Sequence, residues 1–304
     1  MKPILSTLFS SAVESAEKAK QTALLSVCLR CISVSIAAIL LTGCVLRLGY
    51  NTLNFWIPYY VSDYVSLDSA QERAFEANLD KALEEHRQKE LPKIHRLISS
   101  LQVDLEQPLS FHQISQYHDK FTAIGQESAT IFVPTFSSML RSLNDQQRQQ
   151  FNKKIAGDIE KLRQERAVLT TKQKIKKRST GLQKTAKQWL GTLTNKQRAL
   201  LTELAGYQVE MEPTFFSVRE NFLSDWKTLM AEPQSGAFQQ QLTVTVHQLL
   251  AFENPAAEKE LLFYLNRRFD VMRRLNHSLT DDQRDHLQGL LTGLRKDIAK
   301  LIYQ

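Results

Sequence analysis

The cysteines are the residues whose type and spacing most directly indicate chemistry in this chain. There are three, Cys28, Cys31 and Cys44, and all lie near the amino-terminal end of the 304 residues. Cys28 and Cys31 form a Cys-x-x-Cys pair, but no second pair or nearby histidine completes a zinc site, and no strand-helix context indicates redox work. An exported and processed chain would keep only Cys44, so it could form no internal disulfide.

The residues before Cys44 predict export followed by lipidation. Residues 31–41 form an apolar run of the length of a signal-peptide core, and it is preceded by the basic residues Lys18, Lys20 and Arg30. The run leads into a sequence that resembles the lipobox of bacterial lipoproteins, formed by Leu41, Thr42, Gly43 and Cys44. This resemblance implies that residues 1–43 are removed and that Cys44 carries the lipid that holds the protein on a membrane.

Two further features bear on this anchor. Val45 stands where an aspartate favours inner-membrane retention in enteric-type sorting, so we expect the periplasmic face of the outer membrane rather than the inner membrane. Thirty residues precede Cys31, which is long for a signal peptide and would follow from a start codon assigned too early. The alternative is an uncleaved single-span helix over residues 24–46, in which a central Arg30 would cost about 2.5–3.5 kcal/mol.

The other polar residues show no catalytic or metal-binding spacing. The seven histidines form no His-Glu-x-x-His or similar arrangement. No Gly-x-Ser-x-Gly elbow, phosphate-binding glycine loop or dinucleotide fingerprint occurs. Carboxylates such as Glu84, Glu85 and Asp281 stand where helix faces and caps would place them. We therefore expect no enzyme activity, no cofactor and no metal.

Four short motifs predict where the helices of the chain begin. Each has a leucine, a capping residue, two spacers and a glutamine, the pattern of a capping box in which the cap and the glutamine bond each other's backbone N–H groups. The predicted cap and glutamine pairs are Asp68 and Gln71, Asn144 and Gln147, Thr194 and Gln197, and Thr280 and Gln283. The unequal distances between the motifs argue against a regular solenoid.

Apolar residues recur every three or four positions downstream of Cys44, which predicts helices. The longest stripe runs from Leu200 to Leu229. Glycine and proline are sparse, at 10 and 8, so we expect little or no strand and assign residues 238–252 to helix as well. The fold class is all-α: an elongated, curved bundle of long helices behind an N-terminal signal helix, bent or interrupted at Pro92, Pro134 and Pro213.

The expected domains are a signal peptide (1–43), a lipid anchor with an aromatic juxtamembrane helix (44–66) and a helical bundle (67–304). The second of these holds six rings: Tyr50, Phe55, Trp56, Tyr59, Tyr60 and Tyr64. We expect these rings to pack against the bundle. The alternative is that they lie at the membrane interface, which such rings favour.

Positive charge is concentrated in residues 172–187 of a chain whose formal net charge is +7. Because this run has little apolar material, we expect a solvated face at a projecting tip near Gly181. Outside the cytosol, nucleic acid is excluded as a partner, which leaves anionic lipid, lipopolysaccharide or an acidic protein. The candidate residues for such an anionic partner are Lys172, Lys174, Lys176, Lys177 and Arg178.

Two family resemblances follow from these motifs. Leu-Thr-x-x-Gln-type motifs at the heads of long helices resemble the Spy and CpxP family of periplasmic stress proteins, curved bundles that bind unfolded clients without ATP. The chain from Leu41 to Gln304 also resembles a family of bacterial lipoproteins of unassigned function. The residues that carry this second resemblance are Tyr50-Asn51, the aromatic helix, His86-Arg87 and Leu91-Pro92, with Glu85 where a tryptophan is common.

These patterns predict a non-enzymatic, lipid-anchored periplasmic protein whose helical surface binds protein or envelope components. Spy-like chaperoning of an unfolded protein client is the most specific version of this hypothesis. The rival is a structural envelope lipoprotein that bridges the membrane or lipopolysaccharide through its basic region. A cryptic hydrolase is a third hypothesis and would require a concave polar site. The patterns specify no oligomeric state.

Overall fold

The computed structural model describes residues 44–304 of the chain. The predicted signal segment lies outside the described residues, as do Leu41, Thr42, Gly43 and the side chain of Cys44. Every regular element of the described part is helical, which confirms the all-α prediction. The elements are α2 (Cys44–Asn51), α3 (Leu53–Ser62), α4 (Ser69–Lys89), α5 (Leu91–Asp104), α6 (Phe111–Ser142), α7 (Asp145–Ala167), α8 (Thr171–Leu190), α9 (Asn195–Glu210), α10 (Glu212–Ala231), α11 (Phe238–Ala251), the 3₁₀ turn η1 (Pro255–Ala257), α12 (Glu258–His277) and α13 (Asp281–Ile302).

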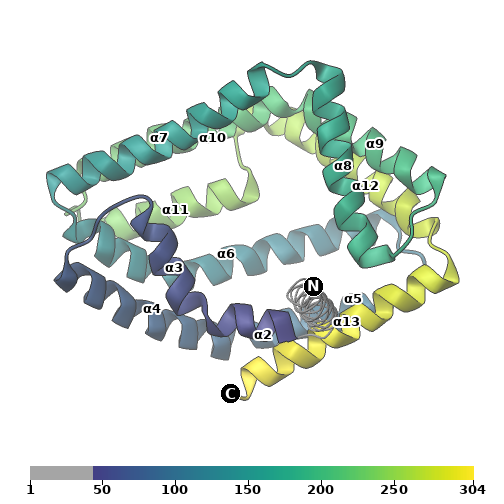
Figure 1. Ribbon diagram of the computed structural model, residues 1–304, viewed down its shortest axis with the longest axis horizontal. Helices are drawn as coiled ribbons and strands as arrows, with labels where there is room; N and C mark the ends of the chain where they lie inside the picture. The colour runs from purple at the N-terminus through teal and green to yellow at the C-terminus, as the bar shows by residue number, and fades with distance from the viewer. Residues whose placement is uncertain (1–43) are drawn as a thin grey trace, which may run out of the picture.

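Most of the helices form a frame around the outside of the fold, and α6 and α11 run across its middle (Figure 1). One side pairs α7 with α10, and the next side pairs α8 with α9 and α9 with α12. Helix α13 then packs against α8, α5 and α2, while α6 packs against α4, α11 and α12. The first and last described helices therefore meet, and Asn51 Nδ2 donates to Gln304 Oε1 at 3.0 Å.

All four predicted capping motifs lie at helix starts, with both reciprocal hydrogen bonds present in each. Their glutamines also meet in pairs across the fold. The amides of Gln71 and Gln147 donate to each other at 3.1 and 2.7 Å, and those of Gln197 and Gln283 do so at 2.7 and 3.0 Å. Each motif thus starts a helix and also ties that start to the start of a distant helix.

The two glutamine pairs follow one pattern. In each pair, both amides donate a second hydrogen bond to the carbonyl oxygen five residues before the partner glutamine: Gln71 to Ser142, Gln147 to Ser66, Gln197 to Ser278 and Gln283 to Thr192. The chain therefore repeats one supersecondary arrangement twice, once between α4 and α7 and once between α9 and α13. This repetition explains why the motifs recur at unequal spacing without forming a solenoid.

The apolar stripes are buried in separate clusters around the frame. The largest gathers residues from α4, α6, α10 and α11, including Phe75 and Phe238, which are fully buried. A second joins α5, α6, α12 and α13, and two smaller clusters join α8 and α9 to the helices beside them. Burying one such Phe or Leu side chain contributes about 1.5–3 kcal/mol, so each side of the frame has its own source of stability.

The prolines act in two different ways. Pro92 and Pro213 lie in the first turn of α5 and α10, where proline is tolerated because the missing N–H would have no helical partner. They separate α4 from α5 and α9 from α10, so the long stripe from Leu200 to Leu229 is divided at Met211. Helix α6, by contrast, continues through Pro134.

A polar cluster fixes α2 on α4. The hydroxyl of Tyr50 lies 3.0 Å from Nδ1 of His86 and donates to the carbonyl oxygen of Leu83 at 3.2 Å. Arg87 lies over the Tyr50 ring at 5.5 Å and donates to Asn51 Oδ1 at 3.4 Å. Burial raises the pKa of Tyr50 to about 12 and lowers the pKa of His86. The Tyr-Asn and His-Arg motifs are therefore one structural contact.

Acidification should weaken the fold through this contact. The pKa of His86 is lower in the folded chain, so the unfolded chain binds more protons once the pH falls below about 6.5. The contribution of His86 is complete above that pH and is lost as the pH falls through the folded pKa. We expect urea titrations between about pH 8 and pH 5 to show a smaller loss of stability in His86→Gln than in the wild type. The exposed His112, changed to Gln, is the control and should leave the slope as in the wild type.

Candidate binding pocket

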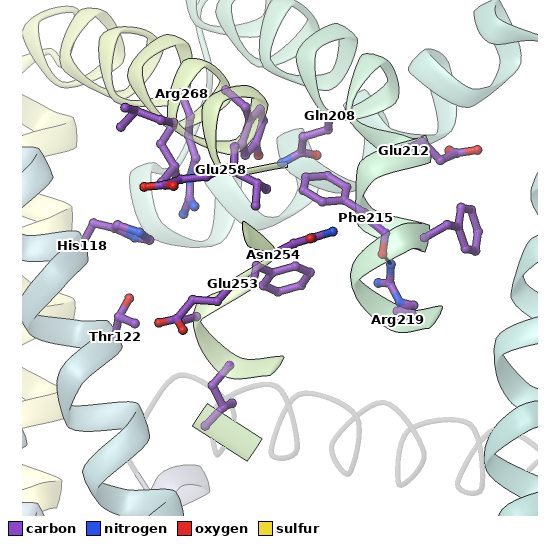
Figure 2. Close-up of a pocket in the computed structure, with 18 of the residues that line it drawn as sticks. His118, Thr122, Gln208, Glu212, Phe215, Arg219, Glu253, Asn254, Glu258 and Arg268 are labelled. Carbon is purple, nitrogen blue, oxygen red and sulfur yellow. Dashed lines mark hydrogen bonds between the residues drawn. The ribbon is translucent and has the colours of Figure 1, made fainter. Parts of the chain in front are cut away.

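A cavity of about 1010 Å³ opens where several helices converge. Its walls come from α6, α7, α8, α9, α10 and α12 and from the end of α11 with its loop to α12. Figure 2 shows His118 and Thr122 on one side, Phe215 and Arg219 on the opposite side, and Glu253 and Asn254 on the loop between them. The volume suits a small organic ligand.

Aromatic rings form the apolar part of the pocket. Phe215 lies edge-on to Phe252 and to Tyr264, with ring centroids at 5.7 and 5.5 Å. Phe252 is the one residue other than glycine with a positive φ in the described chain, 55° at the end of α11. A bulky residue in this conformation is strained, and such strain is found at ligand sites more often than elsewhere. The ring of Phe252 is therefore held in the pocket at a cost.

The loop that carries Phe252 is fixed by Asn254. This residue is buried, accepts a hydrogen bond from the backbone N–H of Ala256 at 3.0 Å and donates to Ser217 Oγ of α10 at 2.9 Å. Since both ends of the Asn254 amide are engaged, the side of the pocket formed by this loop is attached to α10.

Four guanidinium groups line the pocket, and none forms an ion pair with a carboxylate of the described chain. They belong to Arg166 of α7, Arg178 of α8, Arg219 of α10 and Arg268 of α12. Nη1 of Arg166 and Nε of Arg178 are buried and have no hydrogen-bond partner among the described residues. Buried donors of this kind are costly, so a ligand that accepts from them would be favoured.

The arginines weaken one another's charged state. Burial lowers the pKa of Arg178, and the positive charge of Arg166 lowers it further, while Glu212 opposes both effects. Burial and Arg166 also lower the pKa of Arg219. Glu212 is itself engaged, since its Oε1 accepts from Lys174 Nζ at 2.5 Å. Four arginines line the pocket against three glutamates, Glu212, Glu253 and Glu258, so the lining keeps an excess of positive charge.

His118 adds a polar group that is neutral at pH 7. Burial lowers its pKa, and the neighbouring positive charge of Arg268 lowers it further. Its ring lies 5.2 Å from the ring of Phe269. No hydrogen bond in residues 44–304 joins His118 to a hydroxyl or carboxylate group, as a base that activates a nucleophile would require.

The predicted basic run divides between the pocket and solvent. Lys172, Lys176 and Lys177 are exposed, whereas Lys174 and Arg178 are half-buried on the pocket side of α8. The expectation of a wholly solvated tip near Gly181 is wrong, because Gly181 lies inside α8, which packs along α9. Ser179 Oγ lies 2.8 Å from Thr202 Oγ1 of α9, and Leu182 packs against the cluster of Leu200 and Leu204. Arg178 lies one helical turn before Leu182, on the same side of α8.

The expectation that the aromatic segment packs against the bundle holds for only two of its six rings. Tyr50 and Tyr64 are half-buried, but Phe55, Trp56, Tyr59 and Tyr60 are exposed. The inward face of α3 is occupied by the aliphatic side chains of Leu53, Ile57 and Val61. Because one helix cannot turn both sets of residues toward the core, these four rings remain outside.

Most of the residues that line the pocket could not be predicted from the sequence. Arg166, Arg219, Arg268 and Phe252 lie on different helices, and no short motif connects them. The periodicity of α10 offered a partial signal, since Arg219 lies four residues after Phe215.

Among the described residues, no cluster of histidine, cysteine or acidic side chains could hold a metal ion. In the same part of the chain, no helix has both the length and the apolar character that crossing a membrane requires.

The fold and the pocket define an all-helical protein with a cation-lined cavity. The chain belongs to a family of unknown function (DUF6279), whose model matches residues 63–251. No curated protein and no solved structure matches the chain. The family match agrees with the expected family of unassigned function. It does not include the lipobox, and no comparison relates the chain to Spy and CpxP.

Proposed function

We propose that this protein is a non-enzymatic binding protein of the bacterial envelope, tethered through Cys44 to the periplasmic face of the outer membrane, whose pocket takes an amphipathic anion. The observation that carries the proposal is the set of four guanidinium groups, none of them in an ion pair with a carboxylate of the described residues, around a cavity with aromatic walls. Guanidinium groups recognise phosphate and carboxylate oxygens, and the rings provide a surface for an apolar tail. Such a compartment also removes nucleic acid from the possible partners.

The ligand class follows from the two kinds of wall. A small inorganic anion would satisfy the buried N–H groups of Arg166 and Arg178 but leave the rings of Phe215 and Phe252 against water. A neutral lipid would cover the rings but leave the guanidinium groups unpaired. A phosphate ester or carboxylate with a short hydrocarbon part satisfies both, which is the chemistry of anionic lipids and of the lipid part of lipopolysaccharide.

Calorimetric titration of the full chain in phosphatidylcholine nanodiscs tests the proposal. The probes are dihexanoyl phosphatidic acid, dihexanoyl phosphatidylcholine and inorganic phosphate. Of these three probes, we expect only the phosphatidic acid to show saturable binding. The double variant Arg166→Gln/Arg178→Gln should weaken it by about a hundredfold or more, because two hydrogen bonds to charged groups contribute about 1.5–3 kcal/mol each.

The matched control removes the same charge from the outer face of the same helix. Lys176→Gln/Lys177→Gln should change the affinity by a few-fold at most, since both side chains are exposed. An equal loss in both double variants would assign the anion to the outer face of α8 and support the envelope-bridging rival. Binding of inorganic phosphate as tight as that of phosphatidic acid would contradict the part given to the aromatic walls.

Chaperoning of an unfolded client stays a separate prediction. The capping motifs lend it no support in this chain, because their glutamine amides are engaged with one another and with loop carbonyl oxygens. Suppression of client aggregation by a stoichiometric excess of the protein would support it, provided that the suppression survives the double arginine substitution in the pocket.

A further inference from the structure

Helix α3 presents four aromatic side chains to the outside of the fold. Phe55, Trp56, Tyr59 and Tyr60, here called the aromatic ledge, are 61, 43, 53 and 61% exposed. Soluble proteins rarely expose several large rings side by side. Where such a contiguous apolar patch occurs, it usually marks an interaction site. We therefore expect the ledge to be covered by another molecule.

The ledge is a formed surface rather than a loose set of side chains. Phe55 and Tyr59 are stacked with centroids at 6.4 Å, and Trp56 lies edge-on to both Phe55 and Tyr59 at 5.1 and 5.8 Å. The opposite face of α3 packs into the largest core cluster, so the rings cannot rotate inward. Docking of rings that are already ordered loses little side-chain entropy.

The chemistry of the ledge fits the boundary between water and hydrocarbon. The ten residues of α3 include no charged side chain. The indole N–H of Trp56 and the hydroxyls of Tyr59 and Tyr60 have no hydrogen-bond partner among the described residues, whereas Phe55 has no polar group to satisfy. Rings with one polar tip are the side chains enriched at the interface of a bilayer, where water and headgroups bond the tips.

The position of α3 in the chain selects the bilayer over a protein partner. The apolar run 31–41 ends three residues before α2, and α3 follows α2 after one residue. At 1.5 Å per helical residue, Trp56 lies within about 18 Å of Cys44 along the chain. Either a lipid on Cys44 or an uncleaved span over residues 24–46 would hold the ledge beside the membrane surface.

We infer that the aromatic ledge inserts into the interfacial layer of the lipid bilayer and so binds α3 to the membrane. The helical domain then has a fixed orientation on the membrane surface, in addition to its attachment through the N-terminal segment. The surface is distinct from the arginine pocket, whose walls include no residue of α3. Two contacts with the membrane, one through the N-terminal segment and one through α3, define an orientation, as a single flexible tether does not.

Quenching of tryptophan fluorescence by brominated lipid tests this inference on the full chain. The chain is reconstituted into vesicles of phosphatidylcholine and phosphatidylglycerol, with bromine either near the headgroup end or near the methyl end of the acyl chains. Bromine quenches only on close contact. We expect quenching of the wild type, stronger with the shallow bromine, and loss of most of it in Trp56→Phe.

Trp189 provides the matched control, because it lies on α8 and is 39% exposed, close to the 43% of Trp56. Trp189→Phe should retain the quenching of the wild type. Equal quenching in the wild type and Trp56→Phe would overturn the inference. So would a blue-shifted Trp56 emission without quenching, which would show that a second copy of the chain or its own N-terminal segment covers the ledge.

Discussion

Replacing Gln197 by alanine should lower the free energy of unfolding by about 3–5 kcal/mol. It leaves the N–H of Thr194 and the carbonyl oxygen of Ser278 without partners, at about 1–3 kcal/mol each, and breaks both hydrogen bonds with Gln283. The Gln197 side chain is fully buried. Its oxygen accepts from Thr194 N at 2.9 Å, and its amide donates to Ser278 O at 3.0 Å and to Gln283 at 2.7 Å. Chemical denaturation of the full chain, followed by circular dichroism, measures the effect.

Gln71 is the internal comparison for this variant. It makes the equivalent bonds to Asp68, Ser142 and Gln147, but its side chain is partly exposed. Water can replace a lost partner there, so Gln71→Ala should cost about 1–2 kcal/mol. If Gln71→Ala lowers the free energy of unfolding as much as Gln197→Ala does, burial does not determine how much these motifs contribute to stability.

Replacing Arg178 by methionine should stabilise the ligand-free protein by about 1 kcal/mol and at the same time weaken anion binding by about tenfold or more. Methionine keeps the length and the apolar contacts of the side chain. It removes a half-buried charge that Arg166 repels and that has no ion pair in the described chain. Residues that serve binding often reduce stability in this way.

Lys177→Met on the outer face of α8 removes the same charge in water and should change stability by no more than about 0.5 kcal/mol. Denaturation and calorimetry on both variants separate the two roles of the charge. If Arg178→Met destabilises the protein, the guanidinium group stabilises the fold. It would then not be a group that reduces stability in order to bind an anion.

Local features could be predicted from the sequence, because they depend on neighbouring residues. A capping box needs only two side chains three positions apart, and all four that were expected are present. Two further boxes, Ser110 with Gln113 and Thr170 with Gln173, follow the same rule and were missed, although each also has a leucine directly before its cap. The helical class followed from the same local signals.

Contacts between distant segments could not be predicted in this way. The glutamines of each pair are 76 or 86 positions apart, and nothing in a single motif indicates its partner. The pocket has the same difficulty, because only Arg178 of its four arginines lies in a run of charge. The exposure of Trp56 and its neighbours depended on which side of α3 the core would take, and both sides of that helix are apolar.

The second glutamine pair has a consequence for the boundaries of the folding unit. The family match ends at residue 251, yet Gln283 lies beyond it, and so do α12 and α13. A fragment cut at that boundary would strip Gln197 of its partner, remove one wall of the pocket and leave α5 without the helix that covers it. The smallest piece of this chain that closes upon itself therefore extends to its last helix, well past the segment by which its relatives are recognised.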